Sequence, residues 1–174
     1  MRALLPVLAL VASPALAAPE GAPWTQDGGP GRPDCTQCHF DGKAIRQSQA
    51  VYLDGLPAAV VAHETYELSL NIEYSDLITA GFLITAESGG GPAGAFQPTD
   101  NRTSANGAAL RSTKEGVRQE TPDKARWTFR WTAPARIDGP VIFYVAANAS
   151  NDDASAFGDQ IFLSTFEVKT AKAP

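Results

Sequence analysis

Two cysteines and a histidine stand close together near the start of the chain. Cys35 and Cys38 are separated by two residues, and His39 follows directly. C-x-x-C-H is the attachment signature of a c-type haem. Each thiol adds across one vinyl group of the porphyrin, and the adjacent imidazole becomes the proximal ligand of the iron. The motif therefore predicts one covalent haem c, attached through Cys35 and Cys38, with His39 bound to the iron.

Other uses of the cysteine pair stay open at this stage. They are the only two cysteines in the chain, and a local Cys35–Cys38 disulfide in a loop is the main alternative. A thiol–disulfide redox centre usually opens a helix in a βαβ setting, and no such pattern surrounds residue 35. Zinc requires four ligands, and the single histidine beyond the motif cannot complete that set.

The opposite face of the iron has one histidine candidate, His63, which is the only other histidine. The only methionine is Met1, which leaves with the leader described below, so Met/His ligation is excluded. Ligation by His39 and His63 predicts a haem of low potential. It is equally possible that His63 is simply an exposed residue at a strand edge. The second axial position of the iron would then be filled by Lys43, the mature α-amino group or water, or would stay open. Trp24, Phe40 and Tyr52 are candidates to cover the haem or to pack the arm on the domain.

The first 17 residues have the features of a secretory signal peptide. A positive start at Arg2 precedes an apolar run over residues 3–12, and the A-x-A pattern at 15–17 is typical of a cleavage site. The apolar run is too short to span a bilayer. We expect cleavage after Ala17, no membrane span afterwards, and a periplasmic or secreted protein. Export is consistent with the motif, because haem c is attached after translocation.

The elements that must position the motif follow from the remaining pattern. Residues 18–55 form an irregular arm, which is dense in Gly and Pro up to residue 34 and carries the C-x-x-C-H motif. Residues 56–169 contain short apolar or alternating runs with turn signals between them and almost no helical period. This pattern predicts an all-β fold, an immunoglobulin-like antiparallel β-sandwich preceded by the irregular haem-binding arm. Residues 170–174 are a short tail.

Composition excludes several classes of protein. The 174 residues include 44% hydrophobic residues, enough for a packed core. Fourteen Lys and Arg against nineteen Asp and Glu give a net charge of −5, and no basic cluster occurs, so nucleic acid is a poor candidate partner.

The sequence also resembles a known family. The Ala- and Pro-rich arm with the C-x-x-C-H motif is similar to the start of bacterial Reeler-type proteins, the group labelled choice-of-anchor V. The similarity continues in order through YELSL at 66–70, GFLIT at 81–85, WTFRWTAP at 127–134, GPVIFY at 139–144, ANASN at 147–151 and GD at 158–159. The resemblance implies an exported immunoglobulin-like sandwich, with Cys35, Cys38 and His39 as haem attachment and ligand residues. It implies no catalytic residue.

Together these features predict an exported monohaem c-type cytochrome-like protein that transfers electrons to an unidentified periplasmic redox partner. The alternative is a non-haem secreted β-sandwich binding module with a Cys35–Cys38 disulfide. An enzyme that uses an open haem face is a third option, and we favour a carrier or binding protein over it.

Overall fold

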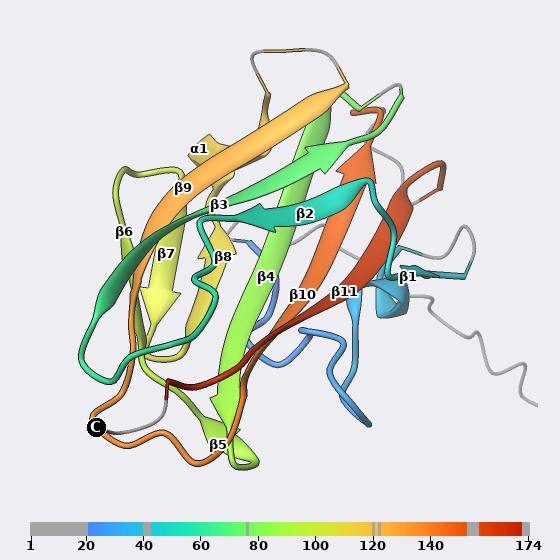
Figure 1. Ribbon diagram of the computed structural model, residues 1–174. Coiled ribbons are helices and arrows are strands. Elements are labelled where there is room, and N and C mark those ends of the chain that lie inside the picture. Colours follow the sequence, from blue (N-terminus) through green and yellow to red (C-terminus); the bar gives the residue numbers. More distant parts are fainter. Residues whose placement is uncertain are drawn as a thin grey trace, which may run out of the picture.

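A computed structural model describes residues 21–39, 43–75, 77–119, 121, 123–152 and 157–171. Within these residues two β-sheets pack face to face (Figure 1). The larger sheet has the strand order β1-β11-β10-β4-β8-β7, with β5 paired to β4, and the smaller sheet has the order β2-β3-β9-β6. The prediction of an all-β antiparallel sandwich is confirmed.

The strands have the following bounds. The larger sheet contains β1 (Ile45–Arg46), β4 (Thr79–Ser88), β5 (Gly91–Pro92), β7 (Thr103–Asn106), β8 (Ala109–Ser112), β10 (Val141–Ser150) and β11 (Gln160–Val168). The smaller sheet contains β2 (Val51–Asp54), β3 (Thr65–Glu73), β6 (Ala95–Pro98) and β9 (Lys124–Thr132). Two short helices, η1 (Cys35–Gln37) and α1 (Lys114–Val117), lie outside the sheets.

The core between the sheets is built by alternating aromatic side chains. On β9, Trp127, Phe129 and Trp131 all point inward and are buried. Trp127 packs on Phe82 of β4 with ring centroids 4.8 Å apart, and Trp131 packs on Phe143 of β10 at 5.0 Å. Such pairs stabilise a core beyond the area that they bury. The alternation in residues 127–131 therefore marks the inward face of the smaller sheet.

The outer face of the larger sheet is covered by the arm. Asp27 is 4% exposed, and its carboxylate accepts hydrogen bonds from Thr85 Oγ1 at 2.5 Å and from Arg32 Nε at 2.7 Å. Arg32 also pairs with Glu87 and lies over the ring of Tyr144, 4.9 Å from its centroid. These contacts attach the arm to β4 and β10.

Further contacts extend the cover to the neighbouring strands. Trp24 stacks on the guanidinium of Arg111 of β8 at 4.4 Å, and Cys35 packs on Leu163 of β11. Leu83 and Ala146 project away from the core and are nevertheless fully buried. Because both faces of β4 and β10 are covered, these strands read in the sequence as nearly continuous apolar runs.

The sheets begin earlier in the chain than the predicted domain boundary at residue 56. β2 pairs with β3 in the smaller sheet, and β1 pairs in parallel with β11 at the edge of the larger one. The segment predicted as an irregular arm thus contributes a strand to each sheet. The predicted signal peptide lies outside the described residues.

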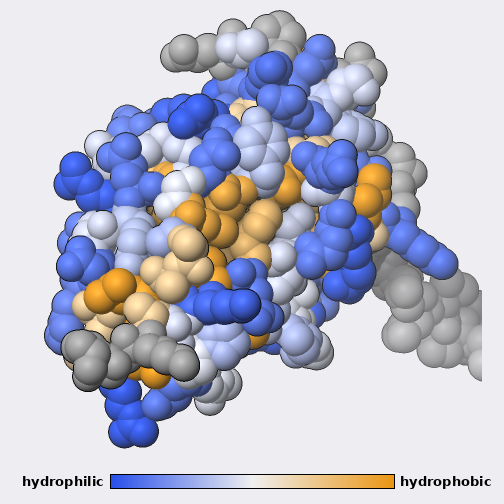
Figure 2. All heavy atoms as spheres, in the orientation of Figure 1, coloured by the Kyte–Doolittle hydropathy of each residue, from blue (hydrophilic) through white to orange (hydrophobic). Residues whose placement is uncertain are grey.

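The face of the molecule seen in Figure 1 has a mostly hydrophilic rim, and a band of more hydrophobic residues crosses its middle (Figure 2). Among the residues that the structure describes, no helix combines the length and apolar character needed to cross a membrane.

Candidate functional site

The C-x-x-C-H segment forms a single turn of 3₁₀-helix. Asp34 caps it, because its carboxylate accepts a hydrogen bond from the Thr36 amide at 2.8 Å. The amides of Cys38 and His39 both donate to the carbonyl oxygen of Cys35, at 3.2 and 3.0 Å. Cys35 begins this turn, and Cys38 is the C-cap residue that follows it.

The two thiols occupy different environments. Cys35 is 8% exposed and packs on Ala146 of β10 and on Ile161 and Leu163 of β11. Burial raises the pKa of its thiol to about 12, so Cys35 stays protonated at physiological pH. Cys38 is exposed, and the structure has no bond between the two sulfur atoms.

His39 is held against the start of β11. Its Nδ1 atom lies 2.5 Å from Oδ2 of Asp159, whose side chain is 2% exposed, and the Asn148 amide donates to the same oxygen at 3.1 Å. Burial alone would raise the pKa of Asp159. Hydrogen bonds from His39, Ser150 and Asn148 outweigh that effect and hold the pKa below its ordinary value.

The structure does not bring His63 to His39. His63 lies in the turn between Val60, which pairs with Thr170 beyond the end of β11, and the start of β3. His39 contacts Asp159, which immediately precedes β11. His39 therefore lies at one end of β11 and His63 near the other. Nine strand residues at about 3.3 Å each place these two ends of β11 about 30 Å apart. In this arrangement His63 and His39 cannot ligate one iron.

The motif residues, as placed, do not fit the predicted haem. Two thioether bonds require both sulfur atoms to reach the porphyrin edge, with the imidazole directed at the iron. Instead, Cys35 is enclosed in an apolar cluster, and the His39 ring lies against Asp159 and Asn148. Among the described residues, no group of three or more His, Cys, Asp or Glu side chains is placed to hold a metal ion.

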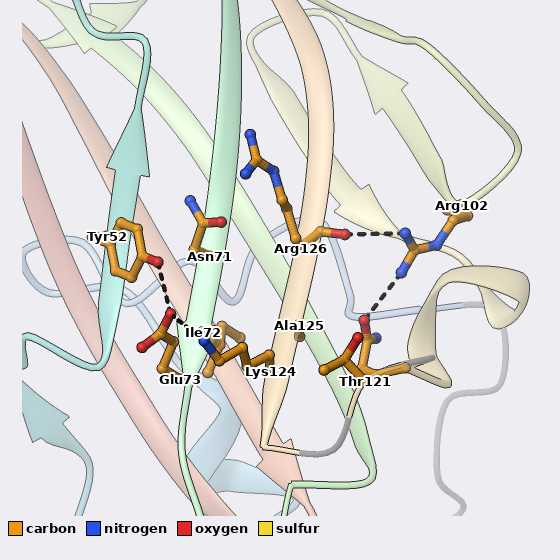
Figure 3. A pocket seen from close by; sticks show the side chains of 10 residues that line it. Tyr52, Asn71, Ile72, Glu73, Arg102, Thr121, Lys124, Ala125 and Arg126 are labelled. Carbon is orange, nitrogen blue, oxygen red and sulfur yellow. Dashed lines mark hydrogen bonds and ion pairs between the residues drawn. The ribbon is translucent and has the colours of Figure 1, made fainter.

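A different site lies on the smaller sheet. A pocket of about 360 Å³ opens beside β2, β3 and β9, next to the segments that precede β7 and follow α1 (Figure 3). Its lining is mainly polar and consists of Tyr52, Asn71, Ile72, Glu73, Arg102, Gln119, Thr121, Lys124, Ala125 and Arg126. Of these residues, the sequence pattern singles out only Tyr52, as a candidate to cover the haem or to pack the arm.

The pocket exists because β6 is shorter than β9. β6 pairs with β9 only from Phe129 to Thr132, which leaves the first half of β9 as a free sheet edge. Side chains take the place of a strand there. Thr99 Oγ1 donates to the Thr128 carbonyl at 2.6 Å, and Arg102 Nη1 donates to the Arg126 carbonyl at 3.0 Å. Unpaired strand carbonyls need such partners, so the edge fixes the position of Arg102.

The charges in the pocket are unequal. Glu73 pairs with Lys124 at 3.4 Å and accepts a hydrogen bond from the Tyr52 hydroxyl at 3.0 Å. That hydrogen bond is the main reason why the pKa of Tyr52 is raised. Arg102 and Arg126 have no carboxylate partner in the described part of the chain. Three cationic side chains against one carboxylate give the lining a net charge of +2, in a chain whose net charge is −5.

Comparison with known proteins identifies the fold. No protein-family model matches the chain, and no curated protein matches its sequence. The chain is similar in structure to the human F-spondin Reeler domain, with a TM-score of 0.52, 17% identity, 74% of this chain and 95% of that domain covered. A second structure, the Reelin-N domain of F-spondin, gives a TM-score of 0.51 with 18% identity, covering 74% and 93%. The chain therefore has a Reeler-like fold.

These findings correct the cytochrome prediction. The structural neighbours are described as Reeler domains, and Cys35 is buried against β10 and β11, where its sulfur is not free to bond a porphyrin. The interpretation as a monohaem c-type cytochrome is therefore wrong. The alternative interpretation, a non-haem β-sandwich binding module, agrees better with the fold and with the pocket.

Proposed function

We propose that the protein is an exported, non-haem binding module that holds a small polar ligand in the pocket of the smaller sheet. The observation that carries this proposal is the pocket itself, a space of about 360 Å³ with a mainly polar and charged lining. This volume lies in the usual range for small-molecule sites. Export is supported by the signal-like residues 1–17.

The arm has a structural role in this proposal. Cys35 and Cys38 span one 3₁₀ turn, so their Cα atoms are about 6 Å apart at about 2 Å rise per residue. Disulfides form across Cα separations of this size. We therefore assign the pair to a local disulfide that closes the turn in the oxidising compartment outside the cytoplasm.

Intact mass tests the non-haem assignment. The chain with its leader is exported in a host that expresses a cytochrome maturation system, and the denatured product is weighed. A mass two hydrogens below the reduced mature chain, with no haem absorbance, supports the proposal. A haem mass that survives denaturation overturns it. The Cys35→Ser, Cys38→Ser double variant is the control, because it should show no loss of hydrogen.

Amide chemical shifts test the choice of pocket. Neutral, acidic and basic polar molecules of monosaccharide size are titrated into ¹⁵N-labelled mature protein. Shifts confined to the amides of Asn71, Arg126 and their neighbours support a binding function at this site. Shifts elsewhere only, or none with any member of the set, overturn the assignment of the ligand to this pocket.

A further inference from the structure

We propose that Cys38 is a modification site: in the reduced, folded protein it forms a mixed disulfide with a small-molecule disulfide, and the fold prevents Cys35 from displacing the added group. The ligand class is a low-molecular-weight disulfide such as oxidised glutathione. This inference rests on the non-haem assignment in the proposed function, which leaves both sulfur atoms without a porphyrin. Three observations support it: the different exposure of the two cysteines, the apolar surroundings of Cys35, and the anchoring of the turn that carries them.

The two cysteines differ in their access to solvent. Cys38 is exposed, whereas Cys35 is 8% exposed and packs on Ala146 of β10 and on Ile161 and Leu163 of β11. Thiol–disulfide exchange begins when a thiolate reaches a sulfur atom of a disulfide, so its rate depends on access. Of the two cysteines, only Cys38 can therefore meet an external disulfide while the arm is docked.

The surroundings of Cys35 stop the exchange after its first step. In an accessible C-x-x-C pair, the second thiol attacks the mixed disulfide and releases the small thiol. Cys35 is enclosed by apolar side chains, and burial raises the pKa of its thiol to about 12, so the thiol stays protonated. An attack by Cys35 requires that it leave this cluster and lose its proton. The mixed disulfide on Cys38 therefore persists while the arm stays docked.

The turn that carries the two cysteines is anchored on both sides. Before Cys35, the Asp34 carboxylate accepts a hydrogen bond from the Thr36 amide at 2.8 Å. After Cys38, Nδ1 of His39 lies 2.5 Å from Oδ2 of Asp159, whose side chain is 2% exposed. A movement that brings Cys35 to the surface must break such contacts. His39 thus acts as a positioning residue that keeps the turn docked.

The reaction needs no oxidant beyond the small disulfide itself. The Cys38 sulfur attacks as its thiolate, a new bond forms between this sulfur and one sulfur of the small molecule, and the original S–S bond breaks. The other half leaves as a thiolate, which takes up the proton that Cys38 lost. The number of disulfide bonds is unchanged, and a later attack by a small thiol reverses the modification.

Intact mass and peptide mapping test the inference. The exported mature chain is reduced with a phosphine, desalted, and incubated while folded with oxidised glutathione at pH 8. One glutathionyl group should be added, on Cys38, and should remain after the excess reagent is removed. In urea, release of glutathione with closure of the Cys35–Cys38 disulfide should be at least roughly tenfold faster, because Cys35 then reaches the mixed disulfide. Addition to Cys35, no addition, or equally fast release from the folded protein overturns the inference.

Matched variants identify the role of each residue. Cys35→Ser should keep the glutathionyl group in urea as well, and folded Cys38→Ser should take up none. Leu163→Ala opens the apolar cluster and should speed release from the folded protein roughly tenfold, because Cys35 gains access. Thr165→Ala, at an exposed position on the same strand, should leave the release rate unchanged. Equal release rates in the last two variants overturn the role of burial.

The two proposals fail in different ways. A haem mass in the exported protein, measured before any reduction, overturns the proposed function. A protein that carries no haem and takes up no glutathione on Cys38 overturns this inference alone. The titrations of the pocket on the smaller sheet are independent of both results.

Discussion

The Nη1 atom of Arg102 donates a 3.0 Å hydrogen bond to the carbonyl oxygen of Arg126, across the free edge of β9. One residue from outside the smaller sheet thus completes the hydrogen bonding of that sheet and also lines its pocket. The contact that satisfies the strand carbonyl therefore also orients a cationic group at the pocket.

Replacement of Arg102 by Gln should lower the free energy of unfolding by about 1–2 kcal/mol, because the Arg126 carbonyl and Gln119 lose their donor. Urea denaturation measures the change. Arg130→Gln, an exposed variant on the same strand, should change stability by less than about 0.5 kcal/mol. Equal losses of unfolding free energy in the two variants would show that the hydrogen bonds of Arg102 do not stabilise the fold.

Asp159 should make stability depend on pH in the acid range. Its folded-state pKa lies below the ordinary value of 3.8, so the folded protein binds this proton less readily than the unfolded chain. The contribution is present above the unfolded-state pKa and is lost as the pH falls through the folded-state value. Urea unfolding between pH 6 and pH 2.5 should therefore show a shallower acid decline for Asp159→Asn than for wild type. Asp138→Asn, at an exposed position, should retain the wild-type slope.

The two cysteines should react differently in the reduced, folded protein. Cys38 is exposed, whereas Cys35 is buried with a thiol pKa of about 12. Iodoacetamide at pH 8 should add one carbamidomethyl group, on Cys38, and two groups once the protein is unfolded in urea. Peptide mapping by mass spectrometry identifies the site. Rapid labelling of both cysteines under folding conditions would contradict the burial of Cys35.

Asp27→Asn should loosen the arm without unfolding the sandwich. The buried carboxylate of Asp27 accepts hydrogen bonds from Arg32, Thr85 and the Gly29 amide, and an amide in its place loses the charge and one acceptor. Hydrogen exchange of a peptide covering residues 24–34 should accelerate roughly tenfold, which corresponds to a loss of about 1.4 kcal/mol. Exchange in β3 and β9 should stay as in wild type. Equal acceleration in those strands would indicate global destabilisation instead.

Two glycines with similar positive φ angles should tolerate alanine differently. Gly94 has φ +68°, and an added Cβ would lie 2.3 Å from the carbonyl oxygen of Thr132. Gly107 has φ +58° with no atom within 4 Å of that position. Gly107→Ala should therefore cost about 1 kcal/mol from backbone strain alone, and Gly94→Ala about 3 kcal/mol or more. Thermal or urea unfolding compares the two, and similar costs would contradict the close approach at Gly94.

The sandwich could be predicted because its burial pattern is local. Trp127, Phe129 and Trp131 alternate with polar residues, so their strand and its buried face can be recognised from the sequence. β1 and β2 could not be found in this way. They have two and four residues, and their pairing with β11 and β3 depends on partners far away in the chain.

The candidate site was harder to predict for a different reason. The C-x-x-C-H spacing allows haem attachment, but attachment also requires that the two sulfur atoms and the imidazole are accessible to a porphyrin. Burial of Cys35 by β10 and β11 and the contact of His39 with Asp159 are tertiary events without a local signal. The pocket is similar, because Arg102 and Arg126 come together only where β6 ends.

The arm that covers the larger sheet has a consequence for the order of folding. Its residues precede in the chain the strands on which it rests, β4, β10 and β11, and the last of these ends at residue 168. The turn at Cys35 is held by local hydrogen bonds and forms early, whereas docking waits for contacts of long sequence separation. An oxidant can therefore reach the Cys35 sulfur only after the turn has formed and before β10 and β11 assemble and bury it.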